Sequence, residues 1–172
     1  MLRIREITSD EFSLVWPIFQ DRSSRVGTRL CTRRRRPSRK RRRIWSAPPT
    51  RAFVAERDGV VVGSYMLRPN QPGLGDHVAN AGYVVAPEAR NQGIARALCQ
   101  HSLATAAEAG FTAMQFNFSG RDERRARCIC GHRADSRPLV AFPAPSVMRQ
   151  LGLVDVLVMY RWLGPGKPSP RP

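Results

Sequence analysis

A short polar turn that leads into a helix carries the residues best suited to binding chemistry. The turn fits the pattern Gln or Arg, any two residues, Gly, any residue, then Gly or Ala, and consists of Arg90, Asn91, Gln92, Gly93, Ile94 and Ala95. A turn that enters a helix directly points several free backbone N–H groups and the positive end of the helix dipole at one spot. This arrangement favours a pyrophosphate. Gly93 and Ala95 are small enough for phosphates to approach the backbone, while Arg90 or Arg96 can add charge-assisted hydrogen bonds.

Regular elements flank this turn on both sides and would hold it in place. The apolar run HVANAGYVV predicts a strand over residues 77–85. The segment after the turn predicts a helix over residues 93–109, with Gly110 as a glycine C-cap. AMQFNF predicts the next strand, over residues 113–118. The turn therefore belongs to a strand-turn-helix-strand unit.

The rest of the chain predicts further strands and a shorter helix. A helix is expected from Asp10 to Phe19, capped by Thr8 or Ser9. Apolar runs on either side of the turn at residues 57–59 predict a β-hairpin. We therefore predict one α/β (α+β) domain with a partly antiparallel sheet and the helix 93–109 on one face. Its strands are residues 2–8, 51–56, 60–68, 77–85, 113–118 and 153–163.

The strong positive charge is confined to two segments. The chain of 172 residues has a formal net charge of +16 at pH 7. Residues 21–43 contribute +11 of this charge and residues 119–149 contribute +4, so the remainder is close to neutral. Both segments offer little to bury, and we expect 21–43 and most of 119–149 to be irregular. The domain is predicted to span residues 1–164, with a Gly/Pro tail at 165–172.

Neither a secretory signal nor a membrane span is expected. The start, MLRIREI, is charged at Arg3, Arg5 and Glu6. The apolar run LVDVLVMYRWL is interrupted by Asp155 and Arg161. The four cysteines are expected to be reduced thiols. A cytoplasmic protein with no membrane partner follows.

The segment HVANAGYVVAPEARNQGIARAL resembles the motif that defines the GNAT superfamily of acetyl-CoA-dependent N-acetyltransferases. The resemblance covers about residues 51–118. It implies a GNAT-type mixed, mostly antiparallel sheet with a central splayed strand and a cofactor-binding helix. It also implies that Val84 and Val85 hydrogen-bond the pantetheine arm of acetyl-CoA, and that the amides of Gln92 to Ala95 bind its pyrophosphate. The acceptor would be an amine of a small molecule, an amino acid or a peptide; no metal is implied, and a homodimer is a further expectation.

The catalytic groups of such a reaction are not evident from the sequence. Transfer in this family needs a base that deprotonates the ammonium acceptor and an acid that protonates the leaving thiolate. The base is frequently a carboxylate on the central strand, where this chain has Ala79, Asn80 and Ala81. His77 is interpreted as a solvated residue at the strand's start. The family's usual acid is a tyrosine after the strand 113–118, and this stretch of sequence contains none. Base and acid are therefore unassigned.

The two basic segments stand where the family would have an acidic helix and a helix plus strand. When the degenerate codons of residues 139–148 are read from their third base, they permit G-R-L-P-G-A-F-R-H. This resembles a stretch that many bacterial GNAT proteins carry before an LG-x-VDA-x-VMY ending. The same offset permits A-V-H-L-W from residues 127–130 and D-T-x-x-Y-A from residues 27–32. We interpret both segments as frame-shift products, which would not form the family's second helix and sixth strand in normal packing.

Two functions of other classes stay open beside the N-acetyltransferase. An acyl-CoA-binding domain with little or no turnover would need no acid or base. A basic nucleic-acid-associated protein would use RRRRPSRKRRR, but this run lacks aromatic residues for base stacking, so nucleic acid is a less favoured partner. A zinc site at Cys128, Cys130 and His132 is disfavoured, because their spacing is tight and a fourth ligand is missing.

Overall fold

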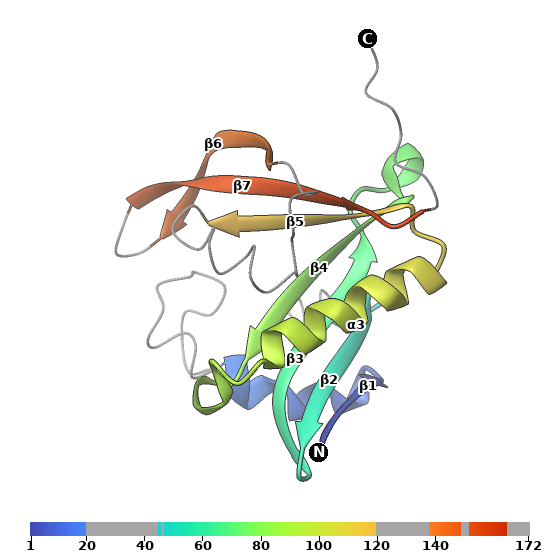
Figure 1. Ribbon diagram of the computed structural model, residues 1–172, viewed down its shortest axis with the longest axis vertical. Coiled ribbons are helices and arrows are strands. Elements are labelled where there is room, and N and C mark those ends of the chain that lie inside the picture. Colours follow the sequence, from blue (N-terminus) through green and yellow to red (C-terminus); the bar gives the residue numbers. More distant parts are fainter. Residues whose placement is uncertain (20–44, 46, 120–137, 149–151, 165–172) are drawn as a thin grey trace.

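Seven strands form one sheet in the computed structural model, which describes residues 1–19, 45, 47–119, 138–148 and 152–164. Their spatial order is β1-β2-β3-β4-β5-β7-β6 (Figure 1). The strands are Leu2–Ile7 (β1), Arg51–Arg57 (β2), Val60–Pro69 (β3), Val78–Val85 (β4), Ala113–Ser119 (β5), Pro138–Met148 (β6) and Gly152–Trp162 (β7). The predicted mixed fold is confirmed, and its six predicted strands agree with the structure to within one residue at each end.

Four consecutive strands at one side of the sheet, β1 to β4, pair antiparallel. The β2–β3 hairpin turns at Asp58 and Gly59, whose φ angles of 51° and 78° are left-handed. An Asp-Gly pair suits a two-residue hairpin because it adopts positive φ at little cost and its twist matches that of the strands. The predicted hairpin is therefore confirmed, and its tip lies at the end of the sheet where β4 ends.

The sheet opens between β4 and β5. These two strands run parallel and pair at three positions, the last of which joins Asn80 to Gln115. Beyond this pair β4 continues to Val85 and β5 to Ser119 without pairing to each other. Figure 1 shows the two strands diverging. The splayed central strand is therefore confirmed, and a V-shaped gap lies between residues 81–85 and 116–119.

A long helix, α3 (Ile94–Glu108), crosses one face of the sheet over β3 and β4 (Figure 1). Gly63 of β3 permits this close approach, because a Cβ there would lie 3.0 Å from Leu98 Cδ1 and 3.1 Å from Ile94 Cγ2. The helix is followed by Gly110, whose φ of 84° suits a left-handed C-cap. The predicted helix 93–109 and its glycine cap are confirmed.

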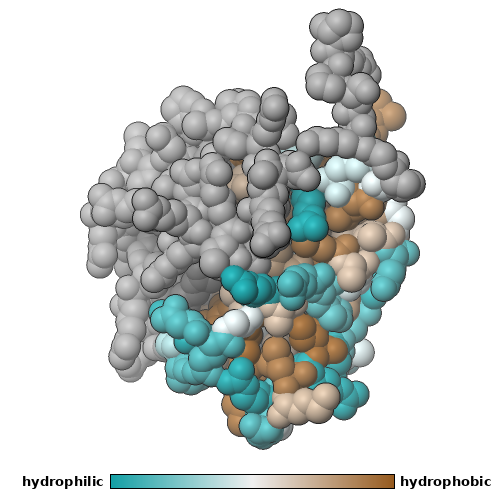
Figure 2. Space-filling model, in the orientation of Figure 1, coloured by the Kyte–Doolittle hydropathy of each residue, from teal (hydrophilic) through white to brown (hydrophobic). Residues whose placement is uncertain are grey.

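One part of the core lies on the face of the sheet beneath α3. Phe53 and Tyr65 stack there with ring centroids 4.6 Å apart, and both side chains are buried. The Tyr65 hydroxyl lies 2.8 Å from His101 Nδ1 of α3 and donates to Thr105 Oγ1 at 3.3 Å. Figure 2, in the orientation of Figure 1, shows polar and apolar residues interspersed over the outer surface of this side.

The segment after β1 is helical but less regular than predicted. A 3-10 helix, η1 (Asp10–Leu14), precedes an α-helical turn at residues 16–19. The predicted side-chain cap by Ser9 is absent; instead Glu11 Oε2 accepts a hydrogen bond from the Thr8 N–H at 3.1 Å. This contact is the returning half of a capping box. The segment packs on the sheet through three buried side chains, those of Phe12, Val15 and Ile18.

Residues 138–148 form a strand, so our expectation that most of 119–149 would be irregular is wrong for this part. β6 pairs antiparallel with β7 at the outer edge of the sheet. Its register is interrupted between Phe142 and Ser146, around the two prolines of this stretch. An edge strand tolerates prolines at such an irregularity, because one of its sides needs no strand partner.

The other expectations for the basic segments fall outside the part of the chain that the structure describes. They concern residues 21–43, residues 120–137 with the disfavoured zinc ligands, and the tail 165–172. Within the described ranges, no helix is both long and apolar enough to span a membrane.

Candidate functional site

The polar turn between β4 and α3 has a backbone that favours glycine at its end. Asn91 and Gly93 have left-handed φ angles of 61° and 80°, and Gly93 is the N-cap of α3. A Cβ built on Gly93 would meet nothing within 4 Å, so open space lies in front of this residue. The Ala97 N–H donates to the Gly93 carbonyl at 3.0 Å. Helix geometry leaves the preceding N–H groups without an acceptor inside the helix, and these belong to Ile94, Ala95 and Arg96.

The side chain of Gln92 ties the turn to two neighbouring segments. Its Nε2 donates to the Glu88 carbonyl at 2.8 Å, next to the 3-10 turn η3 (Pro87–Ala89). Its Oε1 accepts a hydrogen bond from Arg57 Nη1 at the tip of the β2–β3 hairpin. The sequence predicts only a backbone role for Gln92, because nothing in it shows that the hairpin tip comes this close.

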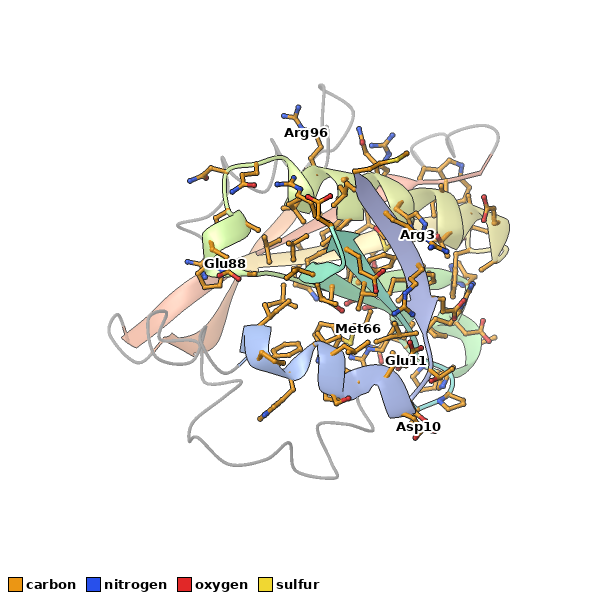
Figure 3. All side chains as sticks on the ribbon, turned by 90° about the horizontal axis from the view of Figure 1, so that it is seen from below. Arg3, Asp10, Glu11, Met66, Glu88 and Arg96 are labelled. Atoms are coloured by element: carbon orange, nitrogen blue, oxygen red, sulfur yellow. The ribbon has the colours of Figure 1, made fainter. Side chains whose placement is uncertain are left out.

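The two predicted arginines stand before and after the turn in the sequence. Arg90 is half-buried, and its N–H donates to the Pro87 carbonyl at 3.3 Å. Arg96 is exposed in the first turn of α3 and projects away from the sheet, whereas Glu88 lies on the opposite side of the turn (Figure 3). The structure thus gathers the predicted residues 90–96 at one place, directly after β4 and at the open end of the gap.

The peptide groups of β4 face β3 and the gap in alternation. The Ala86 N–H donates to the Val62 carbonyl of β3 at 2.9 Å, which marks the even-numbered residues of β4 as those bonded to β3. The position of the Val84 carbonyl agrees, because a Cβ on Gly63 of β3 would lie 3.2 Å from its oxygen. The odd-numbered residues of β4 therefore direct their N–H and C=O groups away from β3.

This alternation changes the residues that could bind in the gap. Val84 pairs with Ser64 and uses its peptide groups within the sheet. Val85 faces the gap, and so does Tyr83, which the resemblance does not implicate. Both residues lie past the last β4–β5 pair, where the two strands have separated. Of the two predicted residues, Val85 thus directs its peptide groups towards the gap, whereas Val84 directs them towards β3.

The vertex of the gap is closed by a network of side-chain amides. Asn80 Nδ2 donates to Asn70 Oδ1 at 3.1 Å, and Asn70 Nδ2 donates to Gln115 Oε1 at 3.0 Å. The Tyr160 hydroxyl donates to the same Gln115 oxygen at 2.6 Å, and Gln115 Nε2 donates to Asn117 Oδ1 at 3.0 Å. In the sequence, Asn80 stands out only because it lies on the strand where the family often has a carboxylate. Polar amides at alternate positions of the apolar strand AMQFNF are the signal that could have revealed the network.

His77 lies outside this network. It precedes the first residue of β4 and is exposed, with its ring Nδ1 2.9 Å from the Leu74 carbonyl oxygen. The backbone carbonyl of His77 accepts a hydrogen bond from the Thr112 N–H at 2.9 Å, which joins the starts of β4 and β5. These contacts agree with its interpretation as a strand-end residue.

A second polar cluster fixes α3 to the sheet behind the gap. The Tyr83 hydroxyl lies 2.6 Å from Ser102 Oγ of α3, so this residue anchors the helix with its side chain and faces the gap with its backbone. Burial raises the pKa of the Tyr65 hydroxyl, and burial lowers the pKa of His101 beside it. Both shifts favour the neutral forms, which keeps charge out of the contact between α3 and the sheet.

Comparison with known proteins agrees with this geometry. The model of the Acetyltransferase (GNAT) family matches residues 2–127. A GCN5-related N-acetyltransferase from Kribbella flavida is 30% identical, with a TM-score of 0.79 over 94% of this chain and 98% of that chain. A GNAT superfamily phosphinothricin acetyltransferase from Sinorhizobium meliloti, solved in complex with AcCoA, is 17% identical, with a TM-score of 0.76 over 95% and 89% of the two chains.

A match to a curated relative covers part of the chain only. The N-acetyltransferase aca1 of Schizosaccharomyces pombe is 37% identical over 57 residues, which is 33% of this chain. The match spans 27% of that relative's length. The family model, in contrast, spans well over half of this chain and includes β1 to β5 and α3. The chain belongs to the acetyltransferase (GNAT) family.

Proposed function

We propose that the protein transfers the acetyl group of acetyl-CoA to a primary amine of a small molecule, an amino acid or a peptide. One observation carries the proposal: α3 begins directly after β4, at the end of the strand that has separated from β5. Acetyl-CoA has parts that match the helix start and the strand, a diphosphate and an amide-containing pantetheine arm. The AcCoA complex of the Sinorhizobium meliloti protein supports the choice of co-substrate.

The turn would hold the diphosphate. The amides of Gln92 to Ala95 supply hydrogen-bond donors at the positive end of α3, and the space in front of Gly93 leaves room for phosphate oxygens. Arg90 and Arg96 would add charge-assisted hydrogen bonds. Each of these groups binds anions, so their convergence favours a ligand with two adjoining phosphates.

The pantetheine arm would then run along β4 towards the vertex. From the turn it would pass Val85 first and Tyr83 next, whose peptide groups face the gap. Strand-like hydrogen bonds to the amides of the arm would complete the edge of β4. The thioester would reach the vertex, where Asn80, Gln115 and Tyr160 gather.

At the vertex the amine nitrogen would attack the thioester carbonyl carbon. A C–N bond forms, the C–S bond breaks, and the sulfur leaves as the thiolate of coenzyme A, which takes up a proton. The amide oxygen of Asn80 is an acceptor for an N–H group of the incoming amine, whereas Gln115 Oε1 already accepts from Asn70 and Tyr160. The amine loses one proton as the C–N bond forms and the thiolate gains one, so the transfer is neutral in protons overall.

A thiol-release assay on the full chain tests this function. Acetyl-CoA is incubated with the protein and with each of a panel of amino acids, polyamines and peptides. Mass spectrometry then detects an added acetyl group on each amine. Thiol release that matches acetylated amine supports the proposal. Calorimetric binding of acetyl-CoA without release would favour the acyl-CoA-binding alternative, and binding to arbitrary DNA that salt weakens, without acetyl-CoA binding, would favour the nucleic-acid alternative.

A further inference from the structure

Arg57, the last residue of β2, places a positive charge beside the proposed diphosphate site. It lies at the tip of the hairpin and is half-buried. Its Nη1 donates to Gln92 Oε1, so the guanidinium touches the turn through a neutral amide. Gln92 is itself held by the Glu88 carbonyl at 2.8 Å. Gln92 thus links the guanidinium of Arg57 to the backbone of the turn.

The acidic residues on either side of Arg57 in the chain are paired with other groups. Glu56 forms an ion pair with Arg5, in which Arg5 Nη2 and Glu56 Oε1 are 2.8 Å apart. Asp58 pairs with the N-terminal amine of Met1 at 3.1 Å. Among the ion pairs of the described residues, none includes Arg57. Within the described part of the chain, its charge therefore has no acidic partner, and it lies next to a site that suits anions.

The chemistry of the guanidinium points to a phosphate. Arginine carries five N–H donors in a planar fork, and Gln92 takes up a hydrogen bond from Nη1 of Arg57. The remaining edge can bind two oxygens of one phosphate at once, a geometry that lysine cannot match. Acetyl-CoA carries such a group beyond its diphosphate, the phosphate monoester on the ribose, with nearly two negative charges at neutral pH. In the proposed function the amides at the start of α3 bind the diphosphate, and the edge of β4 binds the pantetheine arm. The ribose phosphate is therefore the part of acetyl-CoA that still needs a partner.

We propose that Arg57 binds the ribose phosphate of acetyl-CoA and makes the site specific for coenzyme A thioesters over thioesters that lack this phosphate. Gln92 acts as a positioning residue, because it holds the guanidinium beside the turn. The inference rests on the proposed function and adds a residue outside the strand-turn-helix motif. The hairpin tip thereby becomes part of the co-substrate site.

Calorimetry with two ligands tests the inference: acetyl-CoA and its 3′-dephospho analogue. Wild-type protein is expected to bind acetyl-CoA about tenfold or more tighter than the analogue, the range for one charge-assisted contact. Arg57→Gln should lose most of this preference by weakening acetyl-CoA binding, while the analogue binds as before. Arg3→Gln is the matched control, because it removes the same charge from an exposed residue of β1 and should keep the preference.

Two results would overturn the inference alone. One is an unchanged preference in folded Arg57→Gln. The other is a loss of affinity that is equal for both ligands, which would show that Arg57 only supports the turn through Gln92. Wild-type protein that binds neither ligand would contradict the proposed function as well. Failure of the two claims is therefore distinguishable, because the dephospho analogue keeps the diphosphate, the pantetheine arm and the thioester.

Discussion

Asn80 of β4 and Gln115 of β5 are the last paired residues before the two strands separate. Their side chains are also linked, because Asn70 donates to Gln115 and accepts from Asn80. A sheet that opens gives up strand hydrogen bonds on both sides of the gap. Hydrogen bonds between side-chain amides join the two strands at this point. Gln115 is the centre of this network, because its side-chain oxygen accepts hydrogen bonds from both Asn70 and Tyr160.

Replacing Gln115 should therefore destabilise the fold at the vertex. Gln115→Leu removes the acceptor of the half-buried Tyr160 hydroxyl and of the Asn70 amide, and should lower the free energy of unfolding by about 1–3 kcal/mol. Urea denaturation measures the change. Gln100→Leu is the control, because Gln100 is an exposed residue of α3 outside the network and should alter stability by less than about 0.5 kcal/mol. Equal effects of the two substitutions would show that the network does not hold the vertex.

A pair of proline substitutions tests which peptide groups face the gap. Val84→Pro deletes an N–H that is bonded to β3, so it should cost about 1–3 kcal/mol of stability. Val85→Pro deletes an N–H that faces the gap, so it should cost less stability but weaken acetyl-CoA binding. Urea denaturation and calorimetry separate the two effects. The alternation along β4 would be wrong if Val84→Pro proved the milder change in stability and Val85→Pro bound acetyl-CoA normally.

Local sequence patterns were sufficient for the elements that depend on neighbouring residues. Asp58 and Gly59 predict their hairpin because both accept positive φ, and the apolar stripe of Ile94, Ala97 and Leu98 predicts the helix that follows Gly93. Strand β6 was missed because its prolines disfavour a strand in general, and only its place at the sheet edge makes them tolerable.

The vertex and the hairpin contact could not be predicted from such patterns. Asn70, Gln115 and Tyr160 are each 45 residues from the next, and their hydrogen bonds depend on β3, β5 and β7 meeting in one place. The contact of Arg57 with Gln92 likewise joins residues 35 positions apart. Peptide groups alternate along β4 between facing β3 and facing the gap. A shift of one residue in the β3–β4 register would therefore reverse the direction of the Val84 groups, and the sequence does not set this register.

His101 should make stability depend on pH. Burial lowers its pKa below the ordinary value of 6.5, so the unfolded chain binds more protons than the folded one as the pH falls through this range. The contribution to stability should be constant above about pH 6.5 and unfavourable below it. His101→Gln cannot titrate and should flatten the pH dependence of the unfolding free energy between about pH 5.5 and 7. A slope that persists in His101→Gln would exclude this origin.

The most direct test of the co-substrate site compares two substitutions of Gly93 by calorimetry with acetyl-CoA. Gly93→Asn and Gly93→Asp place side chains of nearly equal size in the same open space, and both carry the same cost of about 1–2 kcal/mol for a left-handed backbone. They differ in one negative charge at the point where the diphosphate would lie. We predict that Gly93→Asp binds acetyl-CoA at least about tenfold more weakly than Gly93→Asn, because two like charges repel strongly at such short range. Folded Gly93→Asp protein that binds acetyl-CoA as tightly as the wild type would contradict the assignment of this turn as the diphosphate site.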